Sequence, residues 1–187
     1  MRKLKLQVQM TIDGFICGSN GEMDFVSWNW GDDIKDYVKD LTETIDCIVL
    51  GRKLAQGFIP HWKNVASDST DPDFLSGKKF TNTHKVVFSK TLEKSEWENT
   101  VVANGDIVEE INNLKKQEGA DIIAYGGASF VSSLIKNGLI DELHLFINPT
   151  AIGKGLSIFK DLESNQKFNL VTSQAFDCGI IVLKYSL

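Results

Sequence analysis

Glycines and cations follow several short apolar runs of this sequence, where α/β proteins commonly bind ligands. Gly126-Gly127 comes directly after the apolar run 121–125 and before a segment with helical spacing, 129–136. A helix N-terminus there would present unpaired N–H groups and a partial positive charge. Paired glycines would let a phosphate approach the backbone closely, and they permit a positive φ. The spacing is neither a G-x-G-x-x-G fingerprint nor a P-loop, so a tight turn without a ligand is the competing interpretation.

Cations occur at two further points of the same kind. Gly51-Arg52-Lys53 follows one apolar run, and Ser89-Lys90 follows another. Arginine can bind a phosphate through two parallel hydrogen bonds, whereas lysine adds a charge and serine a hydroxyl. Taken alone, each group is also compatible with solvated surface charge or a strand cap. Because ligands of open α/β sheets bind where the strands end, we expect these residues and the glycine pair to form one site.

The segment after the first apolar run carries the remaining candidates. Asp13-Gly14-Phe15-Ile16 predicts a loop that could lie over a flat ring and present backbone groups to it. Acids further along could donate or relay a proton, although acids at a helix start also stabilise the helix dipole. These acids are Asp24, Asp32, Asp33 and Asp36. Three tryptophans could stack on a heteroaromatic substrate or belong to the core. They are Trp28, Trp30 and Trp62.

Hydrophobic periodicity predicts the elements that position these residues. Expected strands are 4–10, 47–50, 86–88, 100–103, 121–125 and 141–148, the last half-buried with His144 facing solvent or a partner. Expected helices are 32–44, a segment from 107 that Gly119 ends, and 129–136. Residues 64–79 are rich in turn formers and predict a long surface loop, and 168–176 with 180–185 predict a closing hairpin. The order predicts a mostly parallel sheet flanked by helices, with antiparallel strands at one edge.

Composition narrows the class of protein. A chain of 187 residues, with 42% hydrophobic and 24% charged residues, is expected to form one globular domain, 1–187. The net charge of -5 disfavours nucleic-acid binding, and no apolar run approaches the length of a membrane span. Three cysteines without metal or disulfide spacing indicate free thiols and a cytoplasmic protein, with Cys47 in a strand core. We find neither a metal site nor a nucleophile–base pair.

Several segments resemble, in the same order, the dihydrofolate-reductase-like family. They are Ile12–Ile16, Leu50–Lys53, Val87–Leu92 and Tyr125–Phe130. Leu139–Leu145 and Pro149–Gly155 resemble the reductase domain of bifunctional riboflavin-biosynthesis deaminase–reductases. Leu54 departs from the hydroxyl residue usual in the family, and the sequence has no deaminase zinc-ligand spacing, so we do not expect the bifunctional enzyme.

The resemblance implies a dihydrofolate-reductase-like three-layer α/β fold, in which a mixed, mostly parallel eight-stranded sheet with a C-terminal antiparallel hairpin binds NADPH across its strand ends. By motif, the pyrophosphate would be held by Gly126, Gly127, Ala128 and Ser129, and the 2′-phosphate side by Arg52, Lys53, Ser89 and Lys90. The cofactor motifs also include Gly51 and Tyr125, and the nicotinamide would be bordered by Gly14 and Ile16. Classical dihydrofolate reductases orient the pterin with a carboxylate on the first helix, for which Asp33 and Asp36 are the candidates here.

We therefore expect an NADPH-dependent reductase that transfers hydride to a flat heterocycle. The substrate stays open between a pterin, a ribosylated aminopyrimidine, as in 5-amino-6-(5-phosphoribosylamino)uracil reductase activity, and another ring. One alternative is a nucleotide-binding module of the same fold without turnover, and another is a stress- or resistance-associated oxidoreductase with loose specificity. The resemblance also implies a homodimer, and no nucleic-acid or membrane partner is expected.

Overall fold

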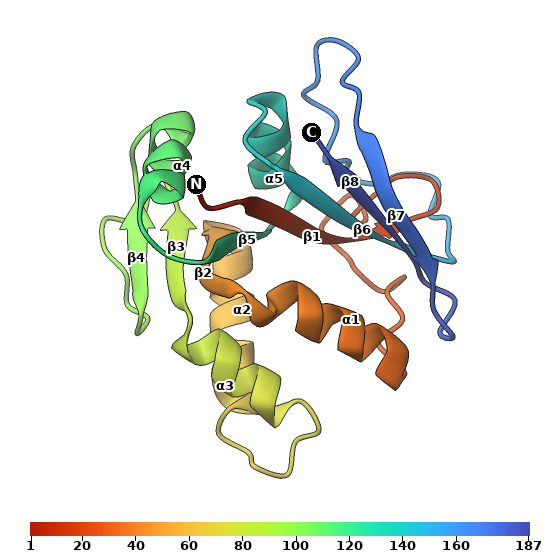
Figure 1. Ribbon diagram of the computed structural model, residues 1–187, viewed down its shortest axis with the longest axis horizontal. Coiled ribbons are helices and arrows are strands. Elements are labelled where there is room, and N and C mark those ends of the chain that lie inside the picture. Colours follow the sequence, from red (N-terminus) through yellow and green to blue (C-terminus); the bar gives the residue numbers. More distant parts are fainter.

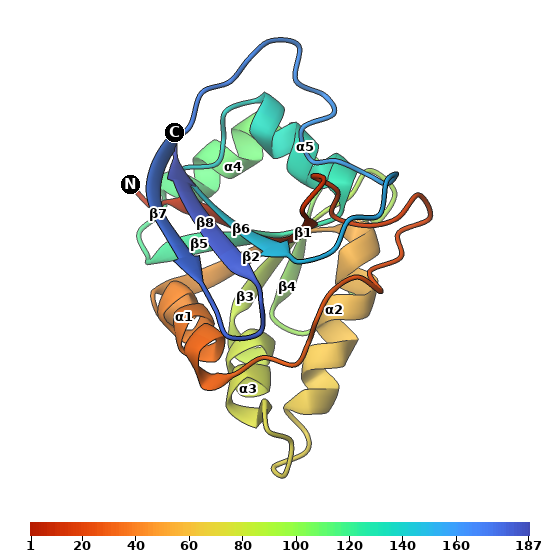
Figure 2. The same cartoon turned by 90° about the vertical axis from the view of Figure 1, so that its right-hand side faces the viewer.

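The computed structural model describes all residues from 1 to 187 and contains one eight-stranded sheet with helices on both faces (Figures 1 and 2). The strands are β1 (Leu4–Thr11), β2 (Ile45–Gly51), β3 (His84–Phe88), β4 (Thr100–Ala103), β5 (Asp121–Tyr125), β6 (Glu142–Asn148), β7 (Asn169–Ala175) and β8 (Ile181–Ser186). The helices are α1 (Asp32–Glu43), α2 (Arg52–Val65), α3 (Phe74–Asn82), α4 (Ile107–Lys116) and α5 (Ala128–Lys136). None of these helices has the length and apolar character of a membrane-spanning segment.

The strand order is β4-β3-β2-β5-β1-β6-β8-β7. Pairing is parallel from β4 to β6 and antiparallel in β6–β8 and β7–β8. The predicted mixed sheet with a C-terminal antiparallel hairpin is therefore confirmed. In Figure 1, α4 and α5 cover one face of the sheet and α1, α2 and α3 cover the other. The chain leaves β1 toward one face and β5 toward the other, and neighbouring strands of this kind mark the usual ligand site of open α/β sheets.

The two faces of the sheet differ in their cores. On the α4–α5 face, one continuous apolar cluster includes Leu4, Leu6, Val8 and Met10 of β1. On the other face, two separate clusters lie over β2–β3–β5 and over β6–β8. Because strand side chains alternate, β1 places only polar residues between these two clusters. We call these residues the β1 polar row: Lys5, Gln7, Gln9 and Thr11.

The predicted loop 64–79 is wrong in its second half, because α3 begins at Phe74. Phe80 of α3 packs against Trp62 of α2 with ring centroids 4.6 Å apart. A Cβ on Gly77 would lie 2.7 Å from the backbone nitrogen of Ala66, so glycine is what lets α3 approach the end of α2. The helix has only nine residues, and turn-forming residues precede it, so its periodicity was too short to be recognised in the sequence.

The prediction that His144 faces solvent or a partner is also wrong. β6 is covered on both faces, and His144 is 4% exposed. Its Nδ1 lies 2.7 Å from the hydroxyl of Tyr37 on α1, so the pair fastens α1 to the sheet. Burial, together with nearby Lys184, lowers the pKa of His144 to about 4. Neighbouring Glu142 would have its pKa raised by burial, but hydrogen bonds from Lys3 and Lys184 hold that pKa at about 2.

His144 gives the protein a specific sensitivity to acid. Between its ordinary pKa near 6.5 and its folded pKa of about 4, the unfolded chain binds more protons, so stability falls as the pH is lowered through this window. The expected contribution at pH 5 is roughly 1–2 kcal/mol. His144→Gln should therefore lose less melting temperature between pH 7 and pH 5 than the wild type loses. His61→Gln, a change of an exposed histidine on α2, is the control, and equal acid sensitivity in all three proteins would contradict this role.

Candidate active site

The segments that follow four parallel strands begin side by side. In register, Leu50 of β2 pairs with Tyr125 of β5, Gly51 of β2 with Phe88 of β3, and Phe88 with Ala103 of β4. The residues after these strands, which include Arg52, Ser89 and the glycine pair, thus lie along one edge of the sheet.

Phe130, in the first turn of α5, packs across this edge. A Cβ on Gly51 would lie 3.0 Å from the Cβ of Phe130. The rings of Phe130 and Phe88 have centroids 5.2 Å apart. One aromatic side chain therefore contacts the ends of β2 and β3 from the helix that follows β5. Phe130 belongs to the motif Tyr125–Phe130, which by itself assigns no role to this side chain.

The two glycines of the pair differ in their surroundings. A Cβ on Gly126 would lie 2.8 Å from the ring of Phe130 and 3.0 Å from Val131, so packing excludes a larger residue. A Cβ on Gly127 would meet no atom within 4 Å. Gly127 is the N-cap of α5 with φ -72°, and neither glycine adopts the positive φ that glycine permits. Gly127 instead leaves open space at the helix start, which a larger side chain would occupy.

The N-termini of α2 and α5 are electrostatically alike. Neither has a side-chain cap or an acidic residue in its first turn. α4, by contrast, is capped by Asp106 and carries two glutamates in its first turn. Arg52 and Lys53 at the start of α2 form no ion pair, so their charges are uncompensated. Two positive helix ends and two free cations therefore meet the same edge.

The two predicted site residues after β3 already use part of their hydrogen-bonding capacity within the protein. The Oγ of Ser89 accepts hydrogen bonds from the backbone nitrogens of Thr91 and Leu92, at 3.1 and 2.9 Å. The Nζ of Lys90 donates to the carbonyls of Asn104 and Gly105, at 2.8 and 2.7 Å. These bonds hold the turns after β3 and β4 together. The hydroxyl hydrogen of Ser89 and the third ammonium hydrogen of Lys90 can still be donated to a ligand.

The loop after β1 is anchored to the segment after β6. Asp13 accepts hydrogen bonds from the backbone nitrogens of Ile152 and Gly153, the latter at 2.7 Å. Gly14 has φ +88° with open space around it, which is where a turn requires glycine. Ile16 is 4% exposed and belongs to the core on the α4–α5 face. In Figure 2 the chain then runs between α2 and α1 to reach the start of α1.

Pairing along β1 is unequal on its two sides. β1 pairs with β5 only from Leu4 to Leu6, which lies opposite Ala124. It pairs with β6 as far as Thr11, opposite Asn148. The side of β1 that faces β5 therefore has no strand partner from Val8 onward, and we call this opening the β1/β5 split. The backbone of Thr11 bonds to Phe15 and Gly14 of the following loop, so only the backbone before Thr11 can be available to a ligand.

The β1 polar row reaches this split. Tyr125 donates its hydroxyl hydrogen to the Oε1 of Gln7 at 2.9 Å and stacks on Phe58 of α2. Burial raises the pKa of Tyr125, so its hydroxyl stays protonated. Gln9 is hydrogen-bonded to Asn148 at the end of β6. No sequence motif singles out Gln7, Gln9 or Asn148. Polar residues at every second position of a central strand were the available signal.

The two candidate acids lie elsewhere. The carboxylate of Asp33 accepts hydrogen bonds from the backbone nitrogens of Ile34 and Asp177, at 2.8 and 2.9 Å. It therefore joins the start of α1 to the β7–β8 turn. Asp36 is exposed, on the side of α1 opposite the buried Ile34 and Leu41. The structure thus brings neither acid to the strand-end edge.

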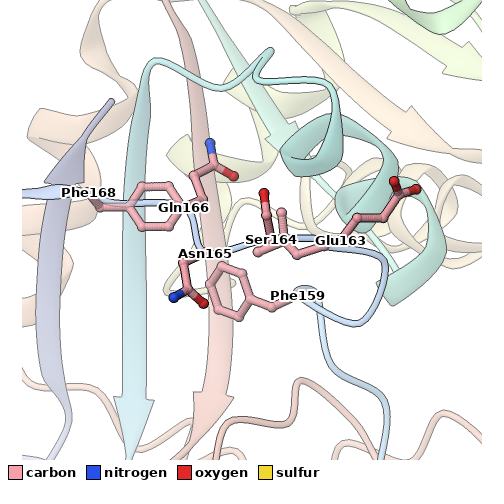
Figure 3. A pocket seen from close by; sticks show the side chains of 7 residues that line it. Phe159, Glu163, Ser164, Asn165, Gln166 and Phe168 are labelled. Carbon is pink, nitrogen blue, oxygen red and sulfur yellow. The ribbon is translucent and has the colours of Figure 1, made fainter.

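A surface pocket of about 560 Å³ lies outside this edge (Figure 3). Its lining residues all come from the segment between β6 and β7: Phe159, Leu162, Glu163, Ser164, Asn165, Gln166 and Phe168. None of the predicted site residues lines this pocket.

The chain is similar to several known proteins. The chain is 34% identical over 186 residues to the uncharacterized protein YyaP of Bacillus subtilis (strain 168), covering 98% of this chain and 94% of YyaP. Its fold is similar to that of a diaminohydroxyphosphoribosylaminopyrimidine deaminase/5-amino-6-(5-phosphoribosylamino)uracil reductase from Thermotoga maritima, with TM-score 0.70 and 20% identity. That match covers 99% of this chain but only 56% of the other protein.

The fold is also similar to that of a dihydrofolate reductase from Enterococcus faecalis complexed with NADP(H), with TM-score 0.62 and 18% identity over 98% of this chain and 95% of the enzyme. These structural matches confirm the expected dihydrofolate-reductase-like fold. The model of the RibD C-terminal domain matches residues 2–182, and the chain therefore belongs to the RibD C-terminal domain family.

Proposed function

We propose that this protein is an NADPH-dependent reductase that transfers hydride to a flat heterocyclic substrate. Family membership supports an oxidoreductase. The observation that carries the proposal is that the uncompensated Arg52 and the open Gly127 lie on one sheet edge, close to the β1/β5 split. This arrangement offers positive charge to phosphates and unpaired backbone to a flat amide-bearing ring.

The proposed cofactor contacts follow the strand ends. The N-terminus of α5, with Gly126, Gly127, Ala128 and Ser129, would hold the pyrophosphate. The 2′-phosphate would contact Arg52 and Lys53, together with the remaining donors of Ser89 and Lys90. Gly51 and Tyr125 would help to position the cofactor but would not neutralise its charge. The side chain of Tyr125 points toward Gln7. Gly14 and Ile16 would border the nicotinamide at the β1/β5 split. NADPH supplies the hydride when it is bound.

The protein itself would act mainly by positioning the nicotinamide against the substrate ring and by excluding water from them. Asp33 is committed to the hairpin contact and Asp36 points outward, so we propose that neither protonates the substrate directly and that water delivers the proton. The substrate would be of the pterin or ribosylaminopyrimidine type, which are the ring classes named for the structurally similar enzymes. Three cysteines without disulfides support a location in the cytoplasm.

Arg52 and Gly127 should contribute to cofactor affinity in different ways. Arg52→Ala should weaken NADPH binding about tenfold or more and reduce the preference for NADPH over NADH, because a charge-assisted contact to the extra phosphate is lost. Gly127→Ala should weaken NADPH and NADH alike, because its methyl group enters the space above the α5 N-terminus. Fluorescence titration of the folded proteins measures both effects.

Gly126→Ala and Lys63→Ala are the controls for these variants. Gly126→Ala should lower stability by about 1–3 kcal/mol through overpacking against Phe130, whereas Gly127→Ala should leave the melting temperature nearly unchanged. Lys63→Ala removes an exposed cation at the far end of α2. The proposal fails if the wild type shows no NADPH binding, or if Arg52→Ala keeps both full affinity and full cofactor preference.

The alternative is a nucleotide-binding module without turnover, and the commitment of Asp33 to the hairpin favours it. Absorbance of the reduced nicotinamide separates the two functions. The reductase is expected to oxidise NADPH in the presence of at least one compound from a panel of dihydropterins and aminopyrimidines. Binding of NADPH without any absorbance loss across the panel would support the module instead.

We also propose that the protein is a homodimer that pairs through β7. All seven residues of β7 are exposed and uncharged, and β7 pairs only with β8. An edge strand without charges is prone to pair with another strand. Light scattering should give the mass of two chains for the wild type and of one chain for Leu170→Lys, which places a charge on this edge. A wild-type mass of one chain would remove the proposal.

A further inference from the structure

The orientation of the Gln9 amide is fixed by its neighbours. Asn148 is fully buried, and its Nδ2 donates to the carbonyls of Phe146 and Met10, at 3.1 and 3.3 Å. Its Oδ1 accepts from the backbone nitrogen of Ser27. Because two carbonyls identify the Asn148 nitrogen, the atom of Gln9 that lies 2.9 Å from it must be the acceptor, Oε1. The Nε2 of Gln9 is thereby turned away from Asn148.

The Nε2 group of Gln9 is an oriented hydrogen-bond donor that has no partner within the protein. Gln9 is 8% exposed, and its amide nitrogen donates to no protein atom. The fully buried side-chain atoms without a hydrogen-bond partner are Thr81 Oγ1, Ser132 Oγ and His144 Nε2. The Nε2 of Gln9 is not among them. The nitrogen of Gln9 therefore still reaches solvent. A nearly buried amide that keeps two free N–H bonds is costly unless a ligand accepts them.

The surroundings of Gln9 suit a flat, uncharged ring. Gln9 pairs with Phe146 in register, and Trp30 stacks on Phe146 with centroids 6.2 Å apart and planes at 18°. Gln9 also lies on the part of β1 that forms the β1/β5 split. Asp121 binds Lys5 at the opposite end of the row, and Asp13 lies beside Thr11 at the near end. Around Gln9 itself, Gln7 with its partner Tyr125, and Asn148, carry only neutral amides and a hydroxyl.

We propose that Gln9 determines substrate specificity by donating a hydrogen bond to an acceptor atom of the substrate, a ring carbonyl or an imine-type ring nitrogen. The preferred class is a neutral pyrimidine or pteridine with carbonyl groups at the edge that faces β1. A ring with amino groups at this edge would place donors against the donors of Gln9 and would be disfavoured. This inference rests on the proposed function, since it assigns the second ligand of the same site.

The experiment compares two probes of nearly equal shape, pteridine-2,4-dione and 2,4-diaminopteridine, titrated into the protein with and without saturating NADP⁺. The wild type should prefer the dione. Gln9→Glu retains an acceptor for Asn148 but replaces the donor by a carboxylate, so it should weaken dione binding about tenfold and reverse the preference. Gln9→Met should weaken dione binding without reversing the preference. Gln117→Glu, at the exposed end of α4, is the matched charge control.

NADPH titration of the same variants separates this inference from the proposed function. Intact NADPH affinity in Gln9→Met, together with weaker dione binding, supports the role of Gln9. Unchanged dione binding in both Gln9 variants, or no dione binding by the wild type, overturns it even if NADPH binds. Absence of NADPH binding in every protein would remove the proposed function, while the titrations without cofactor would still decide the role of Gln9.

Discussion

β1 is hydrogen-bonded on both sides, and the unequal length of the two pairings shapes the whole candidate site. β5 accompanies β1 for three paired positions, whereas β6 accompanies it for seven. The helices that follow β5 and β1 lie on opposite faces of the sheet, and β1 has no strand partner along the β1/β5 split. The position of the glycine pair and the reach of Gln9 both depend on this geometry, because each follows from where one strand stops and its neighbour continues.

The positive potential at the strand-end edge arises because two helices begin there without acidic residues. α2 and α5 begin without acidic residues or side-chain caps, whereas α1 and α4 carry acids in their first turns. Uncapped helix N-termini leave N–H groups unsatisfied, which costs stability in the free protein. The placement of these two uncapped ends next to uncompensated Arg52 and Lys53 is understandable if an anion completes them.

The other end of the sheet is built for stability instead. Glu142 lies between Lys3 and Lys184, and Tyr37 contacts His144, so buried polar groups there are largely paired within the protein. Asp33 adds a second attachment of α1 through the β7–β8 turn. α1 is thus held at two points, and it forms a firm support beside the β1 polar row. The polar groups that anchor α1 are mostly paired within the protein, whereas the Gln9 amide nitrogen beside the β1/β5 split has no protein partner.

The sequence by itself determined the order of elements, the mostly parallel sheet and the residues at the strand ends, because hydrophobic periodicity and glycine positions are local properties of the chain. It also placed Gly126-Gly127, Arg52 and Ser89 at the ends of three strands, but it left the distances between them open. Only the tertiary structure decided that α3 packs on α2, that His144 is buried, and that Asp33 is used by the hairpin, since each depends on a contact between segments distant in sequence. The same reason applies to Gln9. Alternation shows a polar residue on a strand, but only the tertiary structure makes this residue nearly buried and leaves its amide nitrogen without a protein partner.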